Sequence, residues 1–161
     1  MDLFNSTILK LEQKGVKIDD IAEITFDLQK SYINDLKIEH VKEEVINVIK
    51  KRESINAILT ALLIDEVVEK NLADKDICKI ISDDEGLYGV DEILALSIVN
   101  VHGSIALTNF GYLDKVKPGI IKKLDDLGKN KIHCTTFLDD IVCAIAASAA
   151  SRLAHYNKKT T

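Results

Sequence analysis

The sequence predicts an all-α protein, and three observations support this. The 161 residues include a single proline, Pro118, so little interrupts helix formation. Apolar residues recur at three- and four-residue spacing, as in Phe4, Ile8 and Leu11. Hydrophobic residues make up 47% of the chain, which is enough for a sizeable core. We expect a compact multihelical bundle, a single all-helical domain over residues 1–161, with an apolar central helix surrounded by others.

Several amphipathic helices are expected in the first half of the chain. Gly15 ends the first helix, and Asp19 resembles an N-cap for a second helix that closes near Tyr32. Further helices are expected at about residues 39–51, at 53–71 as a continuation or restart, and at 74–81. The segment DDEGLYG then breaks the pattern.

The second half of the chain is more apolar and should hold the centre of the molecule. Residues 90–107 are apolar around most of a helix circumference, which is typical of a core segment. Residues 109–119 read as irregular, and Pro118 suits the start of another helix. Residues 137–155 form the last helix, whose small alanine and serine faces permit close helix contact. We expect this last helix to be the central one.

Acidic residues within this apolar sequence are its most informative feature. They are Asp84, Asp91, Glu92, Asp114, Asp139 and Asp140. Burying a charged group is costly, and neighbouring carboxylates repel one another until a cation or protons intervene. Two core helices that each begin with an acidic pair could bring four carboxylates together around one cavity. A bound metal ion would compensate them.

Helix-end stabilisation is the alternative explanation for these acids. Thr136 is a plausible N-cap, which would place Asp139 and Asp140 in the first turn of the last helix. Asp91 and Glu92 follow the Gly89 break in the same way. Acids in a first turn interact favourably with the helix dipole, by about 0.3–1 kcal/mol each. Both explanations remain open at this point.

Carboxylate oxygens suit Mg²⁺ or Mn²⁺, whereas zinc would recruit histidine or cysteine. The four histidines and three cysteines offer no such pattern, and no CxxC occurs, so we expect reduced, partly buried thiols. Lys115 and Lys117 flank Asp114 near an expected helix start, where a phosphate could meet both ammonium groups. A solvated lysine pair is the simpler reading of that spacing.

The charge and hydropathy of the chain restrict its partners. Its formal charge is −5 and no Lys/Arg-rich run is present, which argues against a nucleic-acid partner. Neither a signal-peptide pattern nor a stretch of about 18 apolar residues occurs, so we expect a cytoplasmic protein. A peripheral position at the membrane is the alternative, because a local basic patch around Lys115, Lys117, Lys122 and Lys123 would permit transient surface contact.

Three short motifs in order carry a resemblance to a known family. The segments DDEGLYGVDEILA, FGYLDKVKP and FLDDIVCAIAA have the order and approximate spacing of the acidic motifs of the phosphatidylglycerophosphatase A family. The chain is most similar to the short soluble branch of that family, which includes low-temperature-requirement-C-like proteins. The resemblance implies a multihelical fold with one helix surrounded by others. It also implies Mg²⁺-dependent removal of the terminal phosphate from phosphatidylglycerophosphate, a step of phospholipid synthesis.

The resemblance also implies roles for individual residues. Asp91, Glu92, Asp139 and Asp140 match positions expected to hold the metal, and Asp84, Asp114 and Lys117 match positions expected to act on the phosphate. The chain departs from the membrane members at Gly111, where they have arginine, and in lacking a second proline after Pro118, the Gly-rich N-terminal motif and the membrane spans. A missing arginine removes a bidentate phosphate contact.

Three functions follow as hypotheses. The first is the lipid phosphatase that the resemblance implies, and the second is the same chemistry on a soluble phosphate ester. The third is a noncatalytic helical module whose acidic cluster is a metal-stabilised core and which works through homo-oligomerisation. The expected partner is therefore a phosphorylated substrate, a lipid or a small molecule, and a homo-oligomer is compatible with each reading.

Overall fold

The computed structural model describes residues 2–157. Within that range the chain forms nine helices and no strand, which confirms the predicted all-α class. The helices are α1 Leu3–Gln13, α2 Ile18–Gln29, α3 Ile38–Ile49, α4 Arg52–Glu69, α5 Lys75–Ser82, α6 Val90–Val99, α7 Gly103–Val116, α8 Ile120–Lys129 and α9 Leu138–Asn157. None of these helices combines the length and apolarity needed to span a bilayer.

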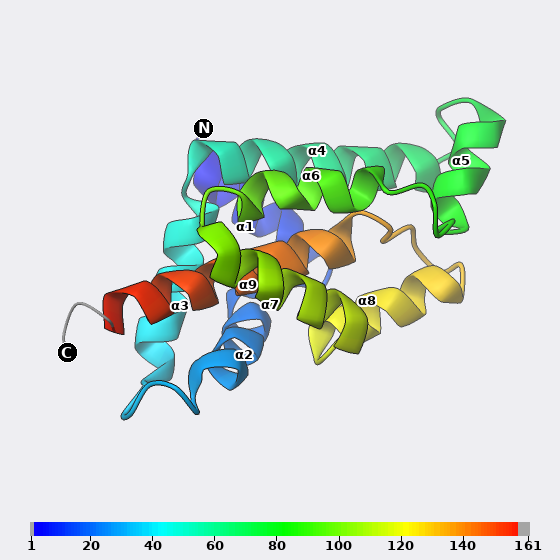
Figure 1. Cartoon of the computed structure of the whole chain (residues 1–161). Coiled ribbons are helices and arrows are strands. Elements are labelled where there is room, and N and C mark those ends of the chain that lie inside the picture. Colours follow the sequence, from blue (N-terminus) through cyan, green and yellow to red (C-terminus); the bar gives the residue numbers. More distant parts are fainter. Residues whose placement is uncertain (1, 158–161) are drawn as a thin grey trace.

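Helix α9 runs through the middle of the molecule and packs against α2, α3, α4, α6, α7 and α8 (Figure 1). Every residue from 138 to 151 is buried. Small side chains along it, such as Ala144, Ala147 and Ser148, are fully buried and let the surrounding helices approach closely. The prediction of an apolar central helix surrounded by others is therefore confirmed for the last helix.

Local signals set the ends of the first helices. Gly15 adopts φ +82° just after α1, as expected for a residue that ends a helix. The prediction that Asp19 caps α2 is wrong. Lys17 occupies the N-cap position, and the Asp20 carboxylate accepts its backbone N–H at 2.8 Å. Asp19 instead pairs with Lys42 at 2.9 Å.

The observed bounds of the next helices agree with the predicted bounds within a few residues. Helix α4 restarts at Arg52 after a short break at Lys50 and Lys51, rather than continuing α3. Asp74 is the N-cap of α5, where its carboxylate accepts the N–H of Asp76 at 3.0 Å. Helix α6 begins directly after Gly89, which adopts φ +66°.

Helices α6 and α7 differ from the prediction in two ways. Residues 109–116 are helical, because Phe110 and Leu113 continue the buried stripe of α7 against α9 and only residues 117–119 are irregular. In addition, each of the two helices buries only one face. Ile93 is 65% exposed and Leu107 is 53% exposed, so their outer faces remain on the surface.

Candidate active site

The predicted acids are placed by the ends of three helices and one loop. Asp91 and Glu92 lie in the first turn of α6, and Asp139 and Asp140 lie in the first turn of α9. Asp114 lies in the last turn of α7, and Lys117 is the C-cap of that helix. Asp84 lies in the loop between α5 and α6, with φ +50°. The three acidic motifs thus lie on different elements: the first on the α5–α6 loop and α6, the second on α7, and the third on α9.

Lys117 links two of the motifs. Its ammonium group lies 3.1 Å from Asp114 Oδ1 and 3.1 Å from Asp139 Oδ2, which is 22 residues further along the chain. Lys117 is a paired, half-buried residue, so the simpler reading of a solvated lysine pair is wrong for Lys117, whereas Lys115 is exposed. Burial alone would lower the pKa of Lys117, but the charges of Asp139 and Asp114 outweigh burial and raise it.

The acidic pair of α9 is deeply buried. Burial raises the pKa of Asp140, and the charges of Asp139, Asp114 and Asp91 raise it further. Burial also raises the pKa of Asp139, although the Lys117 ammonium opposes that change. The backbone N–H of Asp140 donates to Asp139 Oδ1 at 2.9 Å, which fixes the direction of that carboxylate. The raised pKa values mean that the pair resists carrying two negative charges at once, with the Lys117 ammonium compensating Asp139.

The pKa values of Glu92 and Asp84 are also raised by burial and by neighbouring acids. Desolvation raises the pKa of Glu92, and the charges of Asp114, Asp91 and Asp84 add to this change. Desolvation and the charge of Asp91 likewise raise the pKa of Asp84, whereas Lys117 lowers it. Such mutual effects weaken with distance and are largely screened by salt beyond about 8–10 Å at physiological ionic strength, so these acids lie near one another. The structure thus gathers the acids of all three motifs into one electrostatic cluster.

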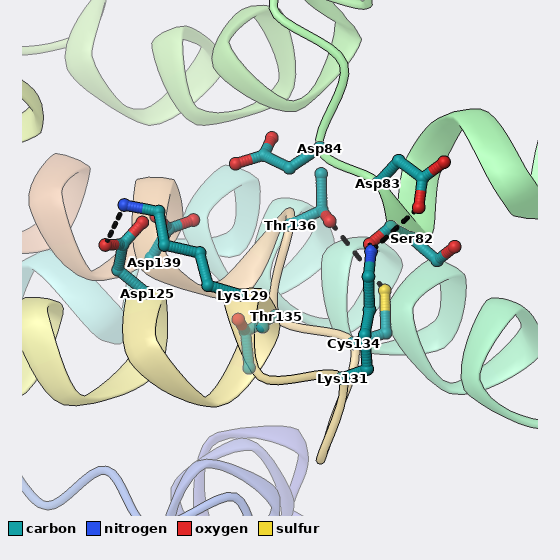
Figure 2. A pocket seen from close by; sticks show the side chains of 11 residues that line it. Ser82, Asp83, Asp84, Asp125, Lys129, Lys131, Cys134, Thr135, Thr136 and Asp139 are labelled. Atoms are coloured by element: carbon teal, nitrogen blue, oxygen red, sulfur yellow. Dashed lines mark hydrogen bonds and ion pairs between the residues drawn. The ribbon is translucent and has the colours of Figure 1, made fainter.

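A small cavity of about 40 Å³ adjoins this cluster (Figure 2). Asp84, Asp125 and Asp139 contribute carboxylates to its lining, and Lys129 and Lys131 contribute ammonium groups. The cavity has room for a few water molecules or an ion, but not for a whole phospholipid. Of the four residues in the two predicted acidic pairs, Asp139 lines this cavity, whereas Asp91, Glu92 and Asp140 do not. A substrate would therefore meet the cluster at the surface rather than inside this cavity.

Two further buried acids belong to this region and were not singled out from the sequence. Asp125 on α8 lines the cavity and pairs with Lys129 at 2.6 Å. Asp65 on α4 accepts the backbone N–H groups of Phe137 and Leu138 at the start of α9. Asp65 interrupts the apolar run LLIDEVV, so the pattern of an acid within apolar sequence could have found it.

Thr136 does not cap α9 as predicted. Its hydroxyl donates to the carbonyl oxygen of Ile81 at 2.6 Å, so it ties the start of α9 to the end of α5. Asp65 caps the start of α9 instead, because its two carboxylate oxygens accept the N–H groups of Phe137 at 3.1 Å and of Leu138 at 3.0 Å. Burial raises the pKa of Asp65 to about 7, although these hydrogen bonds oppose the change.

The donor chemistry of the cluster can be compared with that of a metal site. Among residues 2–157, no three His, Cys, Asp or Glu side chains are grouped as the ligands of one ion. Lys117 provides a positive charge between Asp114 and Asp139. The surrounding oxygens are hard carboxylate donors that repel one another, and such donors fit Mg²⁺ or Mn²⁺. The ligand roles of Asp91, Glu92, Asp139 and Asp140 stay predictions.

The chain is similar over most of its length to several known proteins. It is 50% identical over 151 residues to the uncharacterized protein YutG of Bacillus subtilis, covering 94% of this chain and 90% of that protein. The crystal structure of the low temperature requirement C protein from Listeria monocytogenes superposes with a TM-score of 0.93 and 52% identity, covering 98% of each chain. A protein of unknown function from Bacillus stearothermophilus superposes with a TM-score of 0.91 and 53% identity, covering 95% of this chain and 94% of that one.

The sequence model of the family described as phosphatidylglycerophosphatase A matches residues 11–155. This match includes all three acidic motifs and every helix that packs on α9. The resemblance found in the sequence is therefore confirmed, and the chain belongs to the phosphatidylglycerophosphatase A family.

Proposed function

We propose that this protein is a Mg²⁺-dependent phosphatase that removes the terminal phosphate of phosphatidylglycerophosphate. The contact of Lys117 with Asp114 and Asp139 carries the proposal, because it joins two family motifs at one point. Membership of the family supports phosphatase chemistry. Phosphate release with and without Mg²⁺, from lipid and from soluble esters, tests the metal and the substrate.

The acids and Lys117 would divide the work as follows. The proposed metal ligands come from Asp91, Glu92, Asp139 and Asp140, and Mn²⁺ could replace Mg²⁺. The ion would polarise a phosphoryl oxygen and lower the pKa of a bound water molecule. Asp84 or Asp114 would orient the attacking water, and Lys117 would balance the charge of the phosphate.

The surface around the cluster favours a lipid over a small ester. Val90 and Ile93 are exposed beside the acidic pair of α6, and Tyr112 and Val116 are exposed beside Asp114. Residues 93–113 contain no Asp, Glu, Lys or Arg, although 29% of the whole chain is charged. An apolar, uncharged surface next to a phosphate site suits a substrate whose phosphate is attached to acyl chains.

Gly111 favours a second candidate, a soluble phosphate ester. It lies exposed on α7, one turn before Asp114, where the membrane members have arginine. Without a guanidinium group at this point, the chain lacks one bidentate anchor for a lipid phosphate. The third reading, a noncatalytic metal-stabilised module that acts as a homo-oligomer, predicts metal binding without turnover.

Phosphate release from a panel of esters separates these candidates. The panel contains phosphatidylglycerophosphate in mixed vesicles and glycerol phosphate in solution, each with Mg²⁺ and with EDTA. The lipid proposal expects Mg²⁺-dependent release from the vesicles at a kcat/KM well above that for the soluble ester. The reverse preference supports the second candidate. Metal binding without phosphate release from any ester supports the third.

A further inference from the structure

Asp65 is a buried acid that the proposed chemistry does not use. It lies on α4, is 1% exposed, and has no ion-pair partner among residues 2–157. A buried carboxylate without a cation is costly unless hydrogen bonds compensate it. Three donors do so: the N–H groups of Phe137 and Leu138, and the Cys134 thiol at 3.5 Å.

These hydrogen bonds hold the beginning of α9. The first N–H groups of a helix have no partner within the helix, and a side chain close in sequence usually accepts them. Here the acceptor comes from 72 residues earlier in the chain. Thr136 does not fill this role: its hydroxyl donates to Ile81, and among residues 2–157 no N–H group at the start of α9 donates to it. The position of the first turn of α9 therefore depends on α4.

Asp139 and Asp140 follow directly after the two residues that Asp65 holds. Their carboxylates extend from the first turn of α9, so a change in where or how this turn begins would move both side chains. We propose that Asp65 is a positioning residue for the acidic cluster, which acts through the backbone of Phe137 and Leu138. This inference rests on the proposed function, in which Asp139 or Asp140 holds the metal.

Glu69 offers a matched control on the same helix. It lies one turn after Asp65, and its carboxylate accepts the N–H of Cys134 at 2.9 Å. It thus anchors the same connecting loop, yet it does not contact the first turn of α9. Asp65→Asn and Glu69→Gln each replace one carboxyl group of α4 by an amide. Only the first places an amide donor opposite an N–H group of α9.

The first readout is Mn²⁺ binding by the purified full-length chain, measured by calorimetry. Asp65→Asn is expected to weaken Mn²⁺ binding about 10-fold, as for other residues that position metal ligands without contacting the metal. The Mn²⁺ affinity of Glu69→Gln should stay within about 2-fold of wild type. In the phosphate-release assay, Asp65→Asn should lower kcat and leave KM nearly unchanged, because Asp65 does not meet the substrate. Wild-type binding and kcat in Asp65→Asn would overturn the inference.

Hydrogen exchange gives a readout that needs no metal. The amides of Leu138, Asp139 and Asp140 should exchange about 10-fold faster in Asp65→Asn than in wild type, with the other helices unchanged. If wild type binds no Mn²⁺, the metal in the proposed function fails, and this exchange pattern alone decides the role of Asp65. Unchanged exchange at these amides overturns it. Should Asp65→Asn not fold, Asp65→Ser replaces it, because its small hydroxyl leaves room for water at the freed amides.

Discussion

Lys117 adopts an unfavourable backbone conformation, and its side-chain ion pairs hold it there. It adopts φ 49° and ψ 60°, a left-handed conformation that costs a residue other than glycine about 1–2 kcal/mol. The following residue, Pro118, restricts it further. Two ion pairs at 3.1 Å compensate for this strain. Because Asp139 and Asp114 raise the pKa of Lys117, its ammonium group stays charged at neutral pH.

Replacing Lys117 separates phosphate binding from metal binding. Lys117→Ala should lower kcat/KM by about 10- to 100-fold, the loss expected for one charge-assisted phosphate contact. Its affinity for Mg²⁺ should not fall, because removing a positive charge beside Asp139 leaves more negative potential for the metal. Calorimetry and phosphate release measure the two quantities.

Lys115→Ala is the matched control, because Lys115 is an exposed lysine two residues earlier. It should retain wild-type kcat/KM. Full activity of Lys117→Ala would mean that Lys117 only holds Asp114 and Asp139 in place and does not meet the phosphate.

His102 makes stability depend on pH at a position away from the acidic cluster. Its Nε2 atom is buried and has no hydrogen-bond partner within the described range, residues 2–157. Burial lowers the pKa of His102 to about 4, and the charges of Lys51 and Arg152 add to this change, whereas Glu53 and Glu44 oppose it. Between about pH 6.5 and pH 4, the unfolded chain therefore binds a proton that the folded chain rejects. Stability contributed by neutral His102 is complete above this window and is lost as the pH falls through it.

Comparison with His102→Gln isolates this contribution. The free energy of unfolding of wild type, relative to that of the variant, should fall by about 1–3 kcal/mol between pH 7.5 and pH 4.5. Urea unfolding of both proteins at the two pH values measures the difference. An equal difference at pH 7.5 and pH 4.5 would show that His102 titrates normally in the folded protein.

At the scale of helices, Gly111 is an unusual residue for the middle of α7. It is exposed, and a Cβ atom built there meets no atom within 4 Å. Glycine within a helix costs about 0.5–1 kcal/mol relative to alanine, so Gly111→Ala should stabilise the protein by about that amount. Urea unfolding measures this gain.

Gly111→Arg tests the lost arginine of the membrane members. The side chain has open space, so the variant should be stabilised much as Gly111→Ala is. It also places a guanidinium group one turn from Asp114, and we expect a higher kcat/KM on the lipid phosphate than for Gly111→Ala. Equal activity of the two variants would mean that an arginine at this position does not reach the substrate.

The helices that the sequence predicted well are those whose ends depend on neighbouring residues. Gly15 after α1 and Asp74 before α5 act within a few positions of the helix they limit. The start of α9 could not be predicted from Thr136, because Asp65 caps it from another helix. Residues 109–116 appeared irregular because glycine and charged residues lie there, but packing of Phe110 and Leu113 on α9 keeps them helical.

In the candidate site, too, the sequence predicted the residues of the motifs but not the contacts that depend on the fold. Motif order identified acids that the fold then gathers around the start of α9. Spacing alone could not show that Lys117 turns back to Asp114 and reaches Asp139, since this depends on the left-handed turn before Pro118. Asp125 was missed because an acid on an amphipathic surface helix carries no distinguishing pattern.

At the scale of the whole molecule, buried carboxyl groups gather at one end of the central helix. Helix α9 buries Asp139 and Asp140 beside the acids of α6 and α7, with Lys117 as the one cation that contacts Asp139 among residues 2–157. Repulsion of this kind destabilises a fold, and a site kept for function commonly carries such a cost. The same repulsion would favour binding of a divalent cation.

Magnesium and Asp140→Asn should therefore have linked effects on thermal stability. A cation that binds only the folded chain adds about 2.7 kcal/mol at a hundredfold excess over Kd, or about 5–10 °C in Tm for a chain of this size. Asp140→Asn should raise Tm without metal at neutral pH, because burial and Asp139 raise the pKa of Asp140 in the folded chain, whereas it ionises freely in the unfolded chain, and an amide carries no such cost. The variant should also gain less from Mg²⁺. Asp27→Asn, an exposed change on α2, should respond to Mg²⁺ like wild type. A Tm that saturating Mg²⁺ or Mn²⁺ leaves unchanged in all three proteins would contradict a metal site in this cluster.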